Sequence, residues 1–197
     1  IDPKKPYALT KEEEDIMERL ERAFENCEKL QRHMHFLLNK GGLYKVYNGN
    51  LLYHGCVPLK EDGNLKSVRI FGRAYKGKGL YEVLESYVRK GFYAMDPKEK
   101  ERGKDIMWYI WLSENSPLFG KDKMATFERY FLAEKETHKE KKNPYYLLLE
   151  DEKVVEKILK EFGLENEDAH IINGHVPVKC KDGENPVKCG GKVLVID

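Results

Sequence analysis

Two short apolar segments, far apart in the chain, share one pattern: a β-like run that leads into glycine and histidine. The first is Asn50–Pro58, with the sequence NLLYHGCVP, and the second is Ala169–Pro177, with the sequence AHIINGHVP. An apolar run that ends at a glycine loop places the next polar side chain at the mouth of a buried sheet. The pattern therefore predicts a sheet, with His54 and His175 at the ends of two of its strands.

The other periodic segments alternate between helix and strand, so the predicted fold class is α/β, a mixture of helices and strands. Thr10 and Glu13 have the spacing of a capping box. Apolar residues then recur at helical spacing as far as Gly41-Gly42, which predicts one long amphipathic helix. Asn48-Gly49 predicts a tight hairpin between the strands Leu43–Tyr47 and Asn50–Tyr53.

Further elements follow from the same signals. Proline at the first helical position after Asp96 predicts a helix from there to Leu112. The other predicted elements are the strand Val68–Phe71, the helices Leu80–Tyr93, Thr126–Ala133 and Val154–Phe162, and the strands Ala169–Ile172 and Lys192–Ile196. The glycines between Gly72 and Gly79 lack the G-x-x-x-x-G-K-[ST] spacing of a phosphate loop. They are interpreted as a plain connection from strand to helix.

These elements suggest three parts. Residues 1–60 hold the long helix and the hairpin that leads to the first histidine motif. Residues 61–165 form a mainly helical insertion or cap, and residues 166–197 carry the second histidine motif and the C-terminal strands.

Composition excludes some classes of partner. The 197 residues include 35 Lys and Arg against 34 Asp and Glu, and no basic stripe or acidic tail stands out. Nucleic acid and membrane are therefore not predicted as partners. The four cysteines share no CxxC spacing, so they are interpreted as free thiols of a cytoplasmic protein. A zinc site shared by Cys56, Cys180 and Cys189 is the alternative.

Histidine is the most common metal ligand, but a single histidine near an apolar run is more often a buried group with satisfied hydrogen bonds. His54 and His175 differ from the other four because both follow a strand beside glycine. Two neutral imidazoles do not make a strong site for a hard divalent ion, which also requires carboxylates. The Asp168-Ala169-His170 sequence enters a strand at the opposite end of the sheet, so we do not assign it to this site.

The Tyr53–Pro58 and Asn173–Pro177 motifs resemble the last two metal motifs of the calcineurin-like metallophosphoesterases. More specifically, the chain resembles the bacterial class III fructose-1,6-bisphosphatases. The resemblance rests on the runs NCEKLQRH (26–33), NLLYHGC (50–56), WYIW (108–111), SPLFG (116–120), TFERYF (126–131) and KNPYY (142–146). It covers nearly the whole chain, which matches the middle-to-C-terminal part of such an enzyme.

The resemblance implies a metallophosphoesterase-like sheet in a gluconeogenic hydrolase of the cytoplasm. That hydrolase removes the 1-phosphate of fructose 1,6-bisphosphate with the help of two divalent metal ions, expected to be Mn2+. His54 and His175 would be ligands of the same metal ion. The acidic motifs Asp-x-His, Gly-Asp-x-x-Asp-Arg and Gly-Asn-His are absent here, so the catalytic residues are expected upstream, in a missing N-terminal part of the same enzyme.

Arg129 is the candidate substrate-binding residue, because a guanidinium group matches the geometry of phosphate oxygens. A surface salt bridge is the alternative role for this residue. The pairs Trp108/Trp111 and Tyr145-Tyr146 are predicted to be core. Two other functions stay open, a non-catalytic scaffold or regulatory module and a phosphoesterase for a different phosphate ester. An oligomer also stays open.

Overall fold

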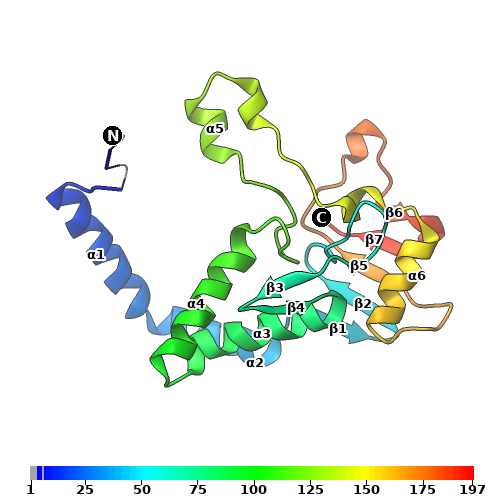
Figure 1. Cartoon of the computed structure of the whole chain (residues 1–197), viewed down its shortest axis with the longest axis horizontal. Helices are drawn as coiled ribbons and strands as arrows, with labels where there is room; N and C mark the ends of the chain where they lie inside the picture. The colour runs from blue at the N-terminus through cyan, green and yellow to red at the C-terminus, as the bar shows by residue number, and fades with distance from the viewer. Residues whose placement is uncertain (1–3, 6) are drawn as a thin grey trace. The chain divides into compact units, whose positions relative to one another are not determined.

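The chain divides into two compact units, Ile1–Gly42 and Leu43–Asp197, and the computed structural model describes residues 4–5 and 7–197. The first unit contains the helices α1 (Lys11–Glu25) and α2 (Glu28–Lys40) (Figure 1). The predicted capping box opens α1: the Glu13 amide donates to Thr10 Oγ1, and the Thr10 amide donates to the Glu13 carboxylate. Both bonds satisfy amides that have no partner inside the helix.

The prediction of one long helix between Thr10 and Gly41 is wrong, because the helix breaks between α1 and α2. At the break, the Asn26 side-chain amide donates to the backbone oxygen of Arg22 at 2.8 Å. Asparagine competes in this way with the regular helical pattern. Cys27 then has an extended backbone and occupies the N-cap position of α2, without a capping bond from its side chain. Apolar spacing continues across both helices, which is why periodicity alone does not locate the break.

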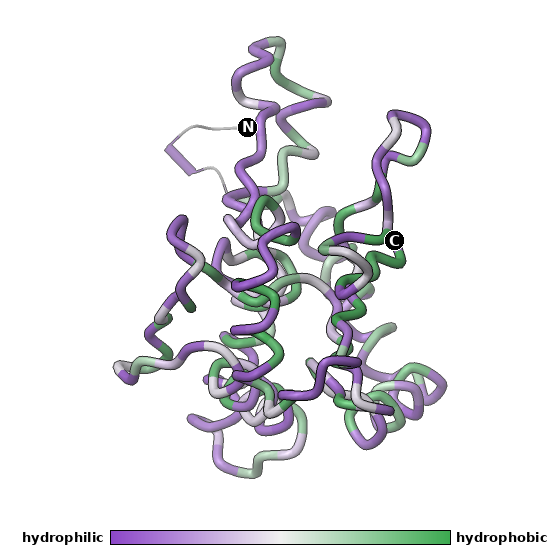
Figure 2. The backbone as a smooth tube through the Cα atoms, turned by 90° about the vertical axis from the view of Figure 1, so that its right-hand side faces the viewer, coloured by the Kyte–Doolittle hydropathy of each residue, from purple (hydrophilic) through white to green (hydrophobic). Residues whose placement is uncertain are grey.

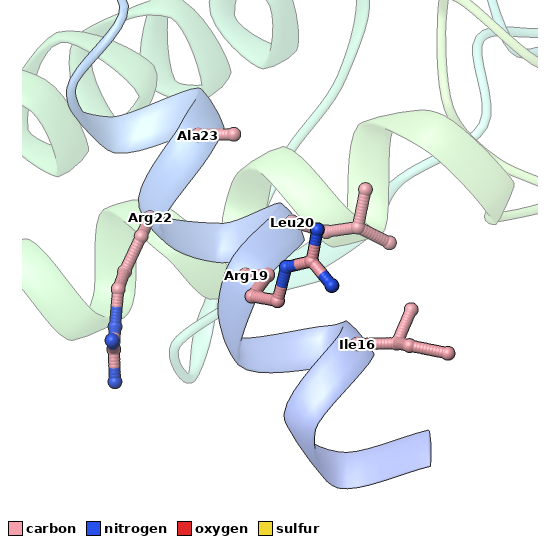
Figure 3. Close-up of a pocket in the computed structure, with 5 residues that line it drawn as sticks. All are labelled: Ile16, Arg19, Leu20, Arg22 and Ala23. Carbon is pink, nitrogen blue, oxygen red and sulfur yellow. The ribbon is translucent and has the colours of Figure 1, made fainter. Parts of the chain in front are cut away.

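Helix α1 has an apolar side. Figure 3 shows Ile16, Leu20 and Ala23 projecting from one side of the helix, while Arg22 points away from them. Together with Arg19 they line a shallow hollow. This arrangement accounts for the helical spacing of apolar residues in the sequence.

The second unit is built on a five-stranded mixed sheet, which confirms the α/β class. Its order is β1-β2-β5-β7-β6, in which β2, β5 and β7 are parallel and the two edge strands are antiparallel to their neighbours. The strands are β1 (Tyr44–Tyr47), β2 (Asn50–Tyr53), β5 (Ile171–Asn173), β6 (Val187–Lys188) and β7 (Val193–Val195). The predicted hairpin joins β1 to β2, with positive φ at both Asn48 and Gly49. The short edge strand β6 was not predicted.

The main core lies around this sheet. Leu51, Ile171 and Val193 of the three parallel strands are fully buried, and α6 (Glu152–Glu161) adds Val155 and Ile158. Figure 2 shows hydrophobic residues concentrated near the C-terminus, where β7 ends, and hydrophilic residues along most loops. The central strands are therefore held mainly by burial of apolar side chains.

A smaller layer contains a second sheet and two helices. Strands β3 (Val68–Ile70) and β4 (Arg73–Tyr75) form a hairpin, followed by α3 (Gly77–Tyr93) and α4 (Pro97–Leu112). Strand β4 was not predicted, because Phe71 and Gly72 both adopt positive φ in a turn with only one glycine. Helix α4 begins as predicted, with Asp96 accepting from the Glu99 amide.

The prediction that Trp108 and Trp111 are core is wrong. Helix α4 packs through Ile106 and Ile110, which are buried, whereas Trp108 and Trp111 are 60% and 61% exposed. Their rings meet edge to face, with centroids 5.4 Å apart. Tyr145 is buried as predicted.

Residues 121–143 form an arm that extends away from the sheet (Figure 1). A backbone bridge between Lys121 and Lys142 closes its base, and it contains the helix α5 (Thr126–Phe131) and the 3-10 turn η1 (Lys135–His138). Three more 3-10 turns follow in the chain: η2 (Pro144–Leu147), η3 (Cys180–Asp182) and η4 (Cys189–Gly191). The charged segment predicted to be solvated, 135–143, thus makes the return side of the arm.

The division into 1–60, 61–165 and 166–197 stays a prediction about the roles of these parts. Within the described residues, no helix combines the length and the apolar character needed to cross a bilayer.

A close contact between α3 and α4 generates a test of the packing. A Cβ on Gly103 would lie 2.1 Å from the backbone nitrogen of Gly91. We expect Gly103→Ala to lower the free energy of unfolding by about 2 kcal/mol or more, because the helices must separate. Gly79→Ala, where no atom lies within 4 Å, should instead raise stability slightly, by about 0.5–1 kcal/mol. Denaturant unfolding of both variants measures this. Equal stability of the two variants would contradict the packing described.

The buried thiol of Cys56 generates a second test. Burial raises the pKa of Cys56 to about 12, whereas Cys180 is exposed. We expect a thiol reagent at pH 8 to label Cys180 rapidly and Cys56 only after denaturation, because the thiolate is the reactive form. Peptide mapping by mass spectrometry identifies the labelled residues, with Cys56→Ser as the control. Rapid labelling of native Cys56 would show that the core around β2 is open.

Candidate functional site

The structure brings His54 and His175 together. Strand β2 ends at Tyr53 and β5 ends at Asn173, and the two strands are parallel neighbours. Parallel strands end at the same edge of a sheet, so the residues that follow them are adjacent. His54 Nε2 and His175 Nδ1 lie 3.0 Å apart, which is within hydrogen-bond distance, and the centroids of the two rings are 4.9 Å apart.

Hydrogen bonds tie the two histidine loops to each other. The Gly174 amide donates to the backbone oxygen of His54 at 2.9 Å. The buried side chain of Asn173 donates from Nδ2 to the backbone oxygen of Gly55, also at 2.9 Å. Asn173 belongs to the second motif, but nothing in its sequence context indicates this role. These bonds fix the separation of the two backbone segments from which the imidazoles project.

A third segment packs against the first loop. The Cys56 amide donates to the backbone oxygen of Pro117 at 2.9 Å. A Cβ on Gly55 would lie 2.4 Å from that same oxygen. Glycine is therefore required beside His54, because the backbone of the Ser116–Gly120 segment approaches too closely for a side chain.

His175 has a left-handed backbone, with φ at 71°. For a residue other than glycine this conformation costs on the order of 1 kcal/mol or more. Such strain persists where the surroundings fix the residue, and it is concentrated at functional sites. The bonds from Asn173 and Gly174 hold the adjacent backbone in place.

The environment of His175 favours the neutral imidazole. Burial lowers the pKa of His175, and the charges of His54 and Lys121 lower it further. The backbone of Phe119 and the charge of Asp197 act in the opposite direction without reversing the shift. Because a metal ion binds the neutral ring, this shift favours the ligating form at neutral pH.

The two nitrogens fit one metal ion in part. In octahedral coordination, ligand nitrogens at about 2.1 Å from an ion and at right angles would lie about 3.0 Å apart, which is the distance observed between these two. His175 Nε2, the other ring nitrogen, is buried and has no hydrogen-bond partner of good geometry. Among the described residues, however, no group of three His, Cys, Asp or Glu side chains is placed to hold a metal. The donor set fits half of a site.

Arg129 lies on the arm, in α5, and is not brought into contact with the histidine pair by any observed bond. Its Nη2 is 3.5 Å from Glu140 Oε1. Glu140 Oε2 is 3.3 Å from Lys121 Nζ, and Glu140 Oε1 also accepts from the Ala125 amide at 3.0 Å. Burial raises the pKa of Glu140, but the Ala125 amide and the charges of Lys121 and Arg129 together lower it below its usual value. Glu140 is therefore an ionised group shared by two cations.

Other residues singled out in the sequence lie elsewhere. His170 Nδ1 is 3.1 Å from Asn50 Oδ1, at the start of β2 and so at the opposite end of the strand from His54. All four cysteines are free. Lys121, which follows the SPLFG segment, had no signal in the sequence that separated it from other surface lysines.

Comparison with known proteins gives consistent matches. A family model described as "Firmicute fructose-1,6-bisphosphatase" matches residues 1–197. The curated "Fructose-1,6-bisphosphatase class 3" of Clostridioides difficile (strain 630) is 55% identical over 198 residues, which is 100% of this chain and 30% of that protein. The protein of the same name from Clostridium botulinum (strain Hall) is 54% identical over the same shares. No solved structure matches the chain.

The chain thus spans about 30% of the length of the curated relatives that it matches. The family model covers every residue of the chain, including both histidine motifs. The resemblance found in the sequence is confirmed, and the chain belongs to the Firmicute fructose-1,6-bisphosphatase family.

Proposed function

We propose that this chain works as part of a longer class 3 fructose-1,6-bisphosphatase. The reaction is hydrolysis of the 1-phosphate of fructose 1,6-bisphosphate to fructose 6-phosphate and phosphate, in gluconeogenesis in the cytoplasm. Family membership supports this proposal, and the observation that carries it to the site is the 3.0 Å separation of His54 Nε2 and His175 Nδ1. The substrate is a sugar bisphosphate, and the rest of the longer polypeptide is the partner of this chain.

In this proposal, His54 and His175 hold one ion of a binuclear metal centre, with Mn2+ as the proposed ion. When bound, a pair of divalent ions would offset the charge of the phosphate ester and lower the pKa of a water molecule. Asn173 and Gly174 donate to backbone oxygens of the other loop, and so hold together the two backbone segments that carry His54 and His175. Arg129 is proposed to help neutralise the phosphate, through the cation network centred on Glu140.

The first test concerns the two histidines. In the full-length protein, we expect His54→Ala and His175→Ala each to lower bound manganese and to reduce turnover by about a hundredfold or more. Metal analysis and a phosphate-release assay measure the two effects. His33→Ala is the matched control, because His33 is an exposed histidine on α2. Unchanged metal content in both site variants would contradict the assignment.

The second test concerns the incomplete donor set. We expect the 197-residue chain alone to release no phosphate in the presence of Mn2+, because the described residues provide no third ligand for either ion. The full-length protein should hydrolyse fructose 1,6-bisphosphate in preference to other phosphate esters. Turnover by the chain alone that equals that of the full-length protein would refute the need for ligands outside it. Preference for a different ester would instead refute the proposed substrate.

A further inference from the structure

The base of the arm lies next to the histidine pair. The segment Ser116–Gly120 contacts the first histidine loop through the bond from the Cys56 amide to Pro117. It also reaches the second loop, because the ring of Phe119 lies edge to face against His175 with centroids 6.3 Å apart. Lys121 is the next residue after this segment, so the first cation of the arm follows directly on a contact with both loops.

Backbone hydrogen bonds fix the position of Gly120, the residue before Lys121. The Gly120 amide donates to the backbone oxygen of Ser116 at 3.0 Å, and the Asn143 amide donates to the backbone oxygen of Gly120 at 2.9 Å. A Cβ on Gly120, whose φ is positive, would lie 2.6 Å from Cys56 Sγ. The two sides of the arm are thus joined at a point that is packed against the residue two positions after His54.

Two cations of the arm share one carboxylate. Lys121 and Arg129 share the single carboxylate of Glu140, on different oxygens, at 3.3 and 3.5 Å. One positive charge of the three-residue group is therefore left over. The side chain of Lys121 is only 23% exposed, against 57% for Arg129. A partly buried charge is screened less by solvent than an exposed one. The unneutralised positive charge of this group therefore attracts an anion more strongly at Lys121 than at Arg129.

We propose that Lys121 is a phosphate-binding residue, whose ammonium group donates to the oxygens of a phosphate monoester held at the His54/His175 pair. Glu140 is then a positioning residue, and Arg129 supplies the second cation that keeps Glu140 from neutralising Lys121. A lysine is a compact charge on a long stem with three donors, which suits a phosphate that arrives and leaves. This inference rests on the proposed function, but it applies both to the phosphate group of a sugar phosphate and to inorganic phosphate.

The test uses the full-length protein with Lys121→Met and the matched control Lys123→Met. Lys123 lies two residues further along the arm and donates from Nζ to the backbone oxygen of Thr137, with no acidic partner among its observed bonds. For Lys121→Met we expect KM for fructose 1,6-bisphosphate and Ki for inorganic phosphate to rise about tenfold or more. Bound manganese should be unchanged. Lys121→Arg should restore part of the lost affinity, and Lys123→Met should match the wild type.

A direct binding measurement separates this inference from the proposed function. Calorimetric titration with inorganic phosphate in the presence of Mn2+ needs no turnover. One outcome is that the wild type binds phosphate and Lys121→Met does not, while the full-length protein shows no bisphosphatase activity. The inference about Lys121 then holds, and the proposed substrate fails. If the enzyme is active and Lys121→Met keeps wild-type KM, Ki and phosphate affinity, then the inference is overturned and the proposed function stands. Loss of manganese in Lys121→Met but not in Lys121→Arg would also overturn it, since Lys121 would then act on the metal site.

Discussion

The parallel pairing of β2 with β5 is the contact on which the rest of the candidate site depends. It joins two segments separated by most of the second unit, in a register that pairs Leu51 with Ile171. Both residues are fully buried. Because the cost of closing a loop grows only slowly with its length, burial of the strand side chains can hold such distant segments together. His54 and His175 then meet because each follows the same end of its strand.

Hydrogen bonds between the loops that follow β2 and β5 hold the two histidine segments in fixed positions. The bonds from Asn173 and Gly174 cross between the loops, and Gly55 allows the backbone at Pro117 to close on them. The left-handed backbone of His175 is part of the same arrangement. Bonds to main-chain oxygens thus fix the backbone from which both imidazoles project, which is a form of preorganisation.

The sequence was sufficient where the signal was local. Asn48-Gly49 specified the hairpin, Thr10 and Asp96 specified helix starts, and the strand exits located the two histidines.

The features that were predicted wrongly or missed from the sequence have a common cause. The break at Asn26, the exposure of Trp108 and Trp111, and the short strand β4 each depend on what packs nearby. Periodicity records that an apolar face exists but not whether a partner covers each residue on it. Lys121 was missed for the same reason, because its surroundings come from residues that lie on three separate stretches of the chain.

The arm and the histidine pair are held by different forces. Among residues 121–143, all of which the structure describes, only Ala125 and Asn143 are buried. The arm is therefore kept together by backbone and side-chain bonds and by the ion pairs of Glu140. Ion pairs near the surface weaken as dissolved salt screens them over about 8 Å at physiological ionic strength, whereas burial of strands does not. Ionic strength would thus act on the cations beside the site while leaving the two imidazoles where they are.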